Sequence, residues 1–183
     1  IGLHTKENSA LHYSATDISL WDTVNVSQHP FLARLGPDLL ANDLNAETLV
    51  QRLLSSDFNN RRLASLYLDQ KFIAGVGNYL RSEILFFARV NPLLKPKELD
   101  LSSKRKLARN TLMIGQRSYR TNGVTLPARL VSKNTKPGGR YYERDRFAVF
   151  ARAGKPCRTC GTSVEKSVLA SRRIYWCPTC QRV

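Results

Sequence analysis

The stretch "CRTCGTSVEKSVLASRRIYWCPTC", residues 157–180, begins and ends with a Cys-x-x-Cys pair. The two pairs hold the four cysteines of the chain, Cys157, Cys160, Cys177 and Cys180. Four thiolates fill the tetrahedral shell of zinc and leave no open position for water or substrate. The spacing therefore predicts one structural Zn²⁺ bound by all four cysteines. An iron–sulfur centre and a redox-active dithiol pair are the alternatives.

The residues between the two pairs are predicted to form a β-hairpin. A turn falls near "VLASR", and the β-forming residues "RIYW" lead back to Cys177. Zinc binding contributes roughly 10–16 kcal/mol in small zinc modules, and here it would stabilise a hairpin too small to fold alone. Arg172 then lies at or beside the hairpin tip, away from the metal. An arginine there is either solvated or in contact with a phosphate or a nucleic-acid groove.

Charge is concentrated in the second half of the chain. The 183 residues carry a net charge of +15. Residues 1–100 hold 10 Lys and Arg against 11 Asp and Glu, whereas residues 101–183 hold 19 against 3. Such an asymmetry indicates a polyanionic partner, and the alternative is a basic surface that only keeps the chain soluble. Nucleic acid is favoured over a membrane, because the sequence has no basic amphipathic helix with an aromatic-rich face and no apolar run of about 20 residues.

The rest of the sequence predicts a β-hairpin over residues 1–14, followed by helices. A short helical signal occurs in "HPFLARLG", and Asn45 is a candidate N-cap. The main helices are expected after Asn45 and over 60–70, 78–90 and 102–120. A polar loop and a strand, "FAVFARAG" at 147–154, should then lead into the cysteine pairs.

A sharp connection precedes the third of these helices. In "DQKFIAGVGNYLRSEILF", residues 69–86, two glycines come just before Asn78. Asn78 is a candidate N-cap, and the same helix N-terminus could bind a phosphate through its free N–H groups. The two roles are compatible.

Together, "FIAGVGNYLRSEILF" and the hairpin "SRRIYWCPTCQ" resemble the formamidopyrimidine-DNA glycosylase/endonuclease VIII family, as do "HPFLARLGPDLL" and "RRLASLYLDQ". The segments look closer to endonuclease VIII. The resemblance implies an α+β fold in four parts. These are the end of an N-terminal β-sandwich (1–25), a helical helix–two-turns–helix domain (26–120), a long basic loop (121–146) and a four-cysteine zinc β-hairpin (147–183).

The resemblance also implies roles for individual residues. Arg34 matches a DNA-contacting arginine, and Asn78 matches the asparagine that holds the backbone beside the lesion. Arg172 matches the hairpin arginine that binds the phosphate flanking the damaged nucleotide and takes part in strand cleavage, so it is the one catalytic candidate. The alternatives are a solvated surface residue for Arg34, a helix cap for Asn78 and a solvated hairpin tip for Arg172.

The family's nucleophile, the amine of an N-terminal proline followed by glutamate, has no match in Ile1-Gly2-Leu3. We expect the chain to begin late in the N-terminal sandwich and to be inactive alone. As an intact protein it would be a monomeric bacterial DNA glycosylase and AP lyase of base excision repair, cytoplasmic and associated with the nucleoid. It would act on oxidised bases, pyrimidines above all, in double-stranded DNA. The alternative is a non-catalytic, zinc-dependent nucleic-acid-binding module.

Overall fold

The computed structural model describes residues 1–14, 18–131 and 145–182. The chain forms two compact units, Ile1–Arg34 and Leu35–Val183. None of the described helices combines the length and the apolar character needed to cross a bilayer.

The first unit is small and its side chains are largely exposed. Strand β1 (Gly2–His4) pairs antiparallel with β2 (Ser9–Leu11), which confirms the predicted hairpin. Two short 3-10 helices follow, η1 (Val26–Gln28) and η2 (Leu32–Arg34), the second at the helical signal of "HPFLARLG". The membership of residues 1–25 in a β-sandwich stays a prediction.

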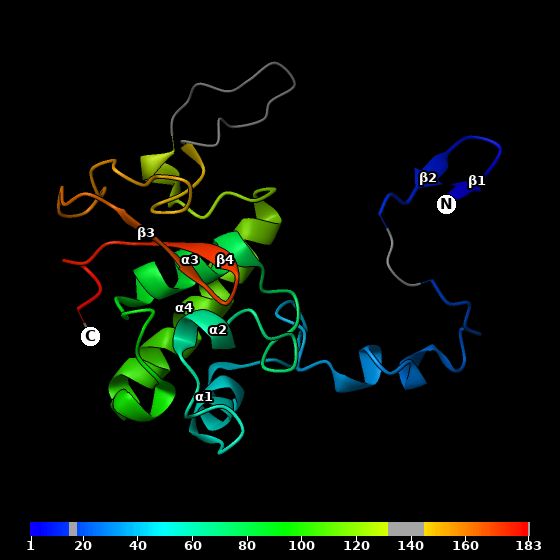
Figure 1. Ribbon diagram of the computed structural model, residues 1–183, viewed down its shortest axis with the longest axis horizontal. Helices are drawn as coiled ribbons and strands as arrows, with labels where there is room; N and C mark the ends of the chain where they lie inside the picture. The colour runs from blue at the N-terminus through cyan, green and yellow to red at the C-terminus, as the bar shows by residue number, and fades with distance from the viewer. Residues whose placement is uncertain (15–17, 132–144, 183) are drawn as a thin grey trace. The chain divides into compact units, whose positions relative to one another are not determined.

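Helices are the main secondary structure of the second unit (Figure 1). They are α1 (Ala46–Leu54), α2 (Leu63–Leu66), α3 (Asn78–Ala88) and α4 (Leu101–Arg120), with short 3-10 helices at η3 (Pro96–Glu98) and η4 (Ala128–Leu130). The Asn45 side chain accepts a hydrogen bond from the Thr48 N–H at 2.9 Å and so caps α1 as predicted. The segment predicted as a helix over 60–70 is helical only over the four residues of α2.

Apolar side chains from all four helices form one core. It includes Leu49 and Leu53 of α1, Leu63 of α2, Ile84 of α3 and Leu107 of α4, all at most 1% exposed. A buried hydrogen bond of 2.8 Å between the hydroxyls of Tyr67 and Thr111 ties the segment after α2 to α4. The four helices therefore pack around one common core.

The predicted zinc hairpin is present. Strand β3 (Glu165–Leu169) pairs antiparallel with β4 (Arg172–Trp176), and β4 contacts α3 (Figure 1). Ala170 and Ser171 form the two-residue turn with φ of 54° and 57°. Left-handed backbone at both positions matches the twist of tight antiparallel hairpins. Arg172 pairs with Leu169 directly at this turn and is exposed, as predicted.

The predicted strand at 147–154 is wrong. The segment forms turns, because its backbone donors bond to a buried side chain rather than to a strand. The N–H groups of Ala148, Val149 and Phe150 donate to the Glu83 carboxylate at 2.8, 2.8 and 2.9 Å, and the Thr125 hydroxyl donates to it as well. Burial raises the pKa of Glu83, an effect that these hydrogen bonds partly offset.

We expect Glu83→Ala to destabilise the chain strongly. Two buried N–H groups and one partly buried N–H group would lose their acceptor, and each loss of a buried hydrogen bond costs about 1–3 kcal/mol. Thermal denaturation should show a melting temperature lower by about 10 °C or more. The control, Glu165→Ala, removes an exposed carboxylate of β3 and should melt like the unmodified chain. If the Glu83 variant melts at the same temperature as the unmodified chain, Glu83 does not stabilise the contact between α3 and the segment at 148–150.

Candidate metal centre and nucleic-acid interface

The four predicted zinc ligands converge on one point. Their sulfur atoms all lie within 4.8 Å of one another, with Cys157 and Cys180 at 3.9 Å and Cys160 and Cys177 at 3.5 Å. Tetrahedral zinc with bonds of about 2.3 Å places its sulfurs roughly 3.8 Å apart. The cysteines are not joined in disulfides. The donor set fits a closed zinc site of four thiolates that has a structural role.

Hydrogen bonds within the two Cys-x-x-Cys segments, here called knuckles, orient the sulfurs. The N–H groups of Thr159 and Cys180 donate to the sulfurs of Cys157 and Cys177, both at 3.4 Å. Hydrogen bonds from Thr162 lower the pKa of Cys160 to about 6. Burial, followed by the neighbouring sulfurs, raises the pKa of Cys180 to about 12, and burial also raises the pKa of Cys177. At neutral pH without metal, these last two are therefore thiols that must lose protons when zinc binds.

The turn before α3 is organised by one glutamine and one glycine. The Gln70 side chain accepts from the Gly75 N–H at 2.9 Å and donates to the Val76 carbonyl at 3.1 Å. Gly75 has a φ of 88°, a left-handed conformation that favours glycine. This geometry sets the direction in which α3 begins.

Asn78 does not cap α3, which corrects one of its predicted roles. The N-cap is Gly77, and Asn78 is the first helical residue. Its side-chain oxygen accepts a hydrogen bond of 2.7 Å from the Arg81 guanidinium, so it is not available to the helix N–H groups. Within the described part of the chain, no side chain caps this helix end. The N-terminal N–H groups of α3 are therefore left for water or for an anionic ligand.

Asn78 and Arg172 line the same hollow, although they come from segments far apart in the sequence. The hollow has a volume of about 570 Å³. Its wall is made by α2 and the segments on either side of it, the turn before α3, the first residue of α3 and the hairpin tip: Arg61, Ser65, Leu68, Asp69, Gln70, Val76, Gly77, Asn78, Ala170 and Arg172. The structure thus brings together two of the three DNA-contact candidates.

The hollow has a positive charge balance. Its one acidic residue, Asp69, forms an ion pair of 2.5 Å with Arg61. Burial alone would raise the pKa of Asp69, but hydrogen bonds from Arg61 and from the Lys71 N–H lower it overall. Arg172 then adds an exposed positive charge. Behind the wall, Arg81 is fully buried, and burial together with the charge of Arg172 lowers its pKa to about 10, so it stays protonated at neutral pH.

Arg34, the third candidate, lies in the first unit. Its Nε donates to the Pro30 carbonyl at 2.7 Å and so holds the end of η2. The structure assigns it to a different unit from Asn78 and Arg172. Its contact with DNA stays a prediction.

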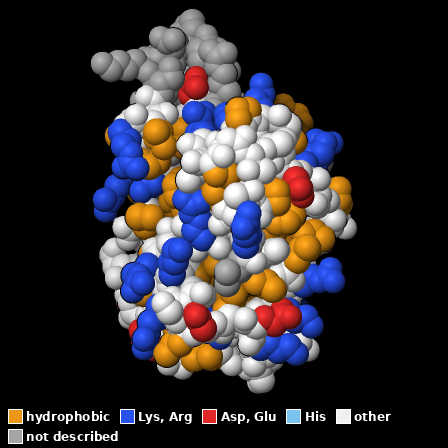
Figure 2. All heavy atoms as spheres, turned by 90° about the vertical axis from the view of Figure 1, so that its left-hand side faces the viewer, with side chains coloured by type: hydrophobic (Ala, Val, Ile, Leu, Met, Phe, Trp, Pro, Cys, Tyr) orange, Lys and Arg blue, Asp and Glu red, His pale blue; other side chains and the backbone are white. Residues whose placement is uncertain are grey.

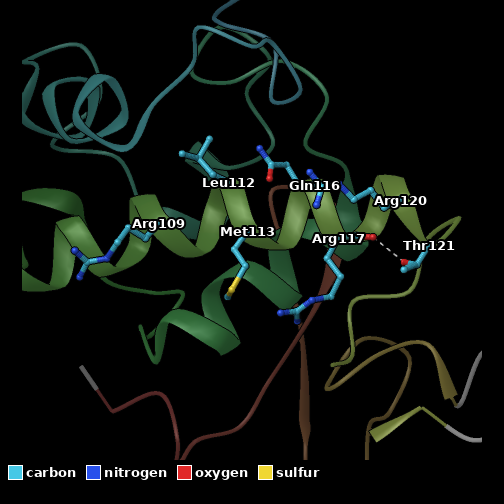
Figure 3. A pocket seen from close by; sticks show the side chains of 7 residues that line it. All are labelled: Arg109, Leu112, Met113, Gln116, Arg117, Arg120 and Thr121. Carbon is cyan, nitrogen blue, oxygen red and sulfur yellow. Dashed lines mark hydrogen bonds between the residues drawn. The ribbon is translucent and has the colours of Figure 1, made fainter. Parts of the chain in front are cut away.

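The exposed face of α4 adds further basic surface. Basic side chains spread over the face drawn in Figure 2, where acidic ones are few. On α4 a shallow hollow of about 560 Å³ is lined by Arg109, Leu112, Met113, Gln116, Arg117, Arg120 and Thr121 (Figure 3). Arg117 is partly engaged, because it donates to the Thr125 carbonyl at 2.8 Å and lies over the Phe87 ring. The α4 sequence has no acidic residue to offset these charges.

Sequence reasoning missed Arg61, Gln70 and Arg81. The helical pattern accounts for all three positions without indicating any role in a site. A signal for Arg81 was present, since an arginine one helical turn after Asn78 can reach it. The acceptors on the hairpin that also bind Arg81 come from residues about 90 positions later, which no local pattern reveals.

Comparison with known proteins agrees with this arrangement. Residues 35–128 match the formamidopyrimidine-DNA glycosylase H2TH domain, and residues 154–183 match the zinc finger found in FPG and IleRS. The endonuclease 8 proteins of Shigella sonnei and Klebsiella pneumoniae are 43% and 44% identical over 181 residues. In both cases the alignment covers 99% of this chain and 65% of the relative, so the chain spans about two-thirds of their length.

Solved structures share the fold. The MutM (Fpg) protein of Thermus thermophilus superposes with a TM-score of 0.69 at 34% identity, over 85% of this chain and 56% of that one. The Fpg of Lactococcus lactis, solved with DNA that contains an abasic site, gives a TM-score of 0.70 at 24% identity, over 88% and 56%. At that identity the second likeness concerns the fold alone.

The fold and the metal centre define a protein that joins a helix–two-turns–helix domain to an FPG-type zinc finger. The chain belongs to the formamidopyrimidine-DNA glycosylase/endonuclease VIII family. The resemblance found in the sequence is thereby confirmed, as is the zinc finger with its four-cysteine site for one metal ion.

We expect zinc affinity to fall as the pH is lowered. Protons compete with the metal for the thiolates, and the raised pKa values of Cys177 and Cys180 mean that binding releases protons at neutral pH. Competition with a chromogenic chelator between about pH 6 and pH 8 should show affinity falling about tenfold or more per pH unit. A pH-independent affinity would contradict a four-thiolate site.

Proposed function

We propose that this chain is the DNA-binding part of a bifunctional DNA glycosylase and AP lyase that acts in base excision repair. The observation that carries the proposal is the hollow in which Asn78, the uncapped N-terminus of α3 and Arg172 meet. The family membership and the identity to endonuclease 8 proteins support it.

The hollow suits a phosphate of the DNA backbone. Helix N–H groups and the amide NH₂ of Asn78 are donors, and the guanidinium of Arg172 offers a charged fork that matches phosphate oxygens. The zinc site stabilises the hairpin that carries Arg172. Arg172 itself lies at the hairpin tip, away from the metal, where it lines the hollow. Zinc supplies rigidity here and no chemistry.

The reaction itself would begin with extrusion of the damaged nucleotide from the duplex, which costs a few kcal/mol and least for a damaged base. An amine nucleophile would then attack C1′ of the sugar and displace the base, which leaves a Schiff base. Elimination from this Schiff base would expel the 3′ phosphate and so break the strand. No residue of this sequence matches the family's proline nucleophile, so our proposal assigns the chain no nucleophile. Asn78 and Arg172 hold the backbone in the productive position, and Arg34 makes a further DNA contact.

Oxidised pyrimidines are the proposed substrates, in double-stranded DNA bound by one copy of the chain. The likeness to endonuclease 8 proteins supports this preference. Neither this part of the enzyme nor the alternative, a zinc-dependent binding module without catalysis, should be trapped covalently on abasic DNA. Covalent trapping of the 183-residue chain on abasic DNA by borohydride would overturn our statement that it carries no nucleophile.

The zinc-loaded chain should bind a duplex that contains a stable abasic-site analogue, with a marked salt dependence. If about six basic groups neutralise phosphates, log K falls against log salt with a slope of roughly −5. Fluorescence anisotropy at a series of salt concentrations measures this slope. A flat dependence would remove DNA as the partner.

Arg172→Ala should weaken binding of the same duplex by about 10- to 100-fold, because a charge-assisted contact contributes about 1.5–3 kcal/mol. The salt slope should become smaller by about one unit. Arg173→Ala is the matched control, since it removes the adjacent exposed arginine, which does not line the hollow. Equal losses in both variants would indicate a diffuse basic surface instead of a phosphate site. Zinc content should be unchanged in both.

A further inference from the structure

We propose that Arg81 is a positioning residue that locks the helix–two-turns–helix turn to the zinc hairpin and orients the Asn78 amide toward DNA. The inference rests on the proposed function, because it concerns the same hollow. Arg81 itself does not line the hollow and is fully buried, so it would act through its neighbours.

The Arg81 guanidinium binds three segments at once. Its Nη1 donates to the Ala64 carbonyl of α2 at 2.8 Å and to the Leu169 carbonyl of β3 at 3.4 Å. Its Nη2 donates to the Asn78 side chain at 2.7 Å and to the Arg173 carbonyl of β4 at 3.1 Å. The Arg172 carbonyl lies at 3.5 Å from the same nitrogen. Both strands of the hairpin, directly beside its turn, are therefore tied to the base of α3.

This contact decides which end of the Asn78 amide faces outward. Arginine has only donors, so only the side-chain oxygen of Asn78 can face it. The NH₂ group then points away from Arg81. Among the described residues none accepts a hydrogen bond from that group, and Asn78 lines the hollow. A phosphate oxygen, which is an acceptor, meets the NH₂ donor and not the carbonyl oxygen.

The charge of Arg81 supports the same role. Burying a cation without an acidic partner is expensive, and within the described part of the chain Arg81 forms no ion pair. It is compensated by carbonyl and amide oxygens alone. Its positive charge stands behind the wall of a hollow that already carries Arg172, which favours an anion there.

A double-mutant cycle tests the proposal. Arg81→Met removes all donors at similar length, and Arg81→Lys keeps the charge without the planar fork. We expect R81M to weaken binding of the abasic-analogue duplex by about tenfold or more, and R81K to recover part of that loss. In an Asn78→Ala background the loss of duplex binding caused by R81M should be smaller by at least about threefold, because the side chain that Arg81 orients is absent. Zinc content should stay at one ion per chain.

Arg117→Met is the control, since it also removes a partly buried, carbonyl-bound arginine but one that lies on α4. Its effect should simply add to that of Asn78→Ala. If the effects of R81M and Asn78→Ala on binding also add, as those of the control pair should, the proposal is overturned. It is likewise overturned if R81M binds like the unmodified chain. Should R81M not fold, the R81K cycle with Asn78→Ala makes the same comparison.

A measurement without DNA separates this inference from the proposed function. Backbone amide hydrogen exchange at Leu169–Arg173 should accelerate by about tenfold or more in R81M, while the knuckle at Cys157–Cys160 is unaffected. Unchanged exchange at the hairpin overturns the proposal even if DNA binding falls. If R81M exchanges faster but the unmodified chain does not bind the abasic duplex, the positioning role of Arg81 is supported. The proposed function is then contradicted instead.

Discussion

Three consecutive polar residues at the centre of α3 hold the zinc-binding part of this chain to its helices. The buried Arg81 binds the carbonyls beside the hairpin turn, Ser82 accepts from the Tyr175 N–H at 3.3 Å, and Glu83 accepts from three N–H groups of the segment at 148–150. Each is fully buried, so each needs its partners in place. The rest of the structure depends on this row, because it fixes where the hairpin tip stands relative to the helix N-terminus.

Zinc and the three polar residues of α3 have different structural roles. Four cysteines close the end of the hairpin distant from the tip and make it stiff, but they do not decide where the tip points. A buried glutamine links the metal end to the helices, since Gln181 accepts from the Cys177 N–H and donates to the Val90 carbonyl, both at 2.9 Å. The tip is positioned by Arg81. A structural metal can in this way support a binding site without taking part in it.

The site that results is a basic hollow with an open helix end, one amide and one exposed arginine. Asp69, its single acid, is already paired with Arg61 and does not repel a phosphate strongly. The arginines that line the separate hollow on α4 add positive charge to the second unit (Figure 3). Long-range attraction therefore comes from many residues, whereas register on the DNA backbone would come from a few that are held rigidly.

The sequence by itself determined the metal ligands, the hairpin with Arg172 at its tip, the cap at Asn45 and the family, because cysteine spacing, strand propensity and capping act over short distances. Only the tertiary structure decided the local form of residues 147–154, whose donors bond to Glu83, and the role of Asn78, whose oxygen is taken by Arg81. It also decided that Asn78 and Arg172 share one hollow. These features depend on contacts between residues far apart in the sequence, which local secondary-structure propensity does not describe.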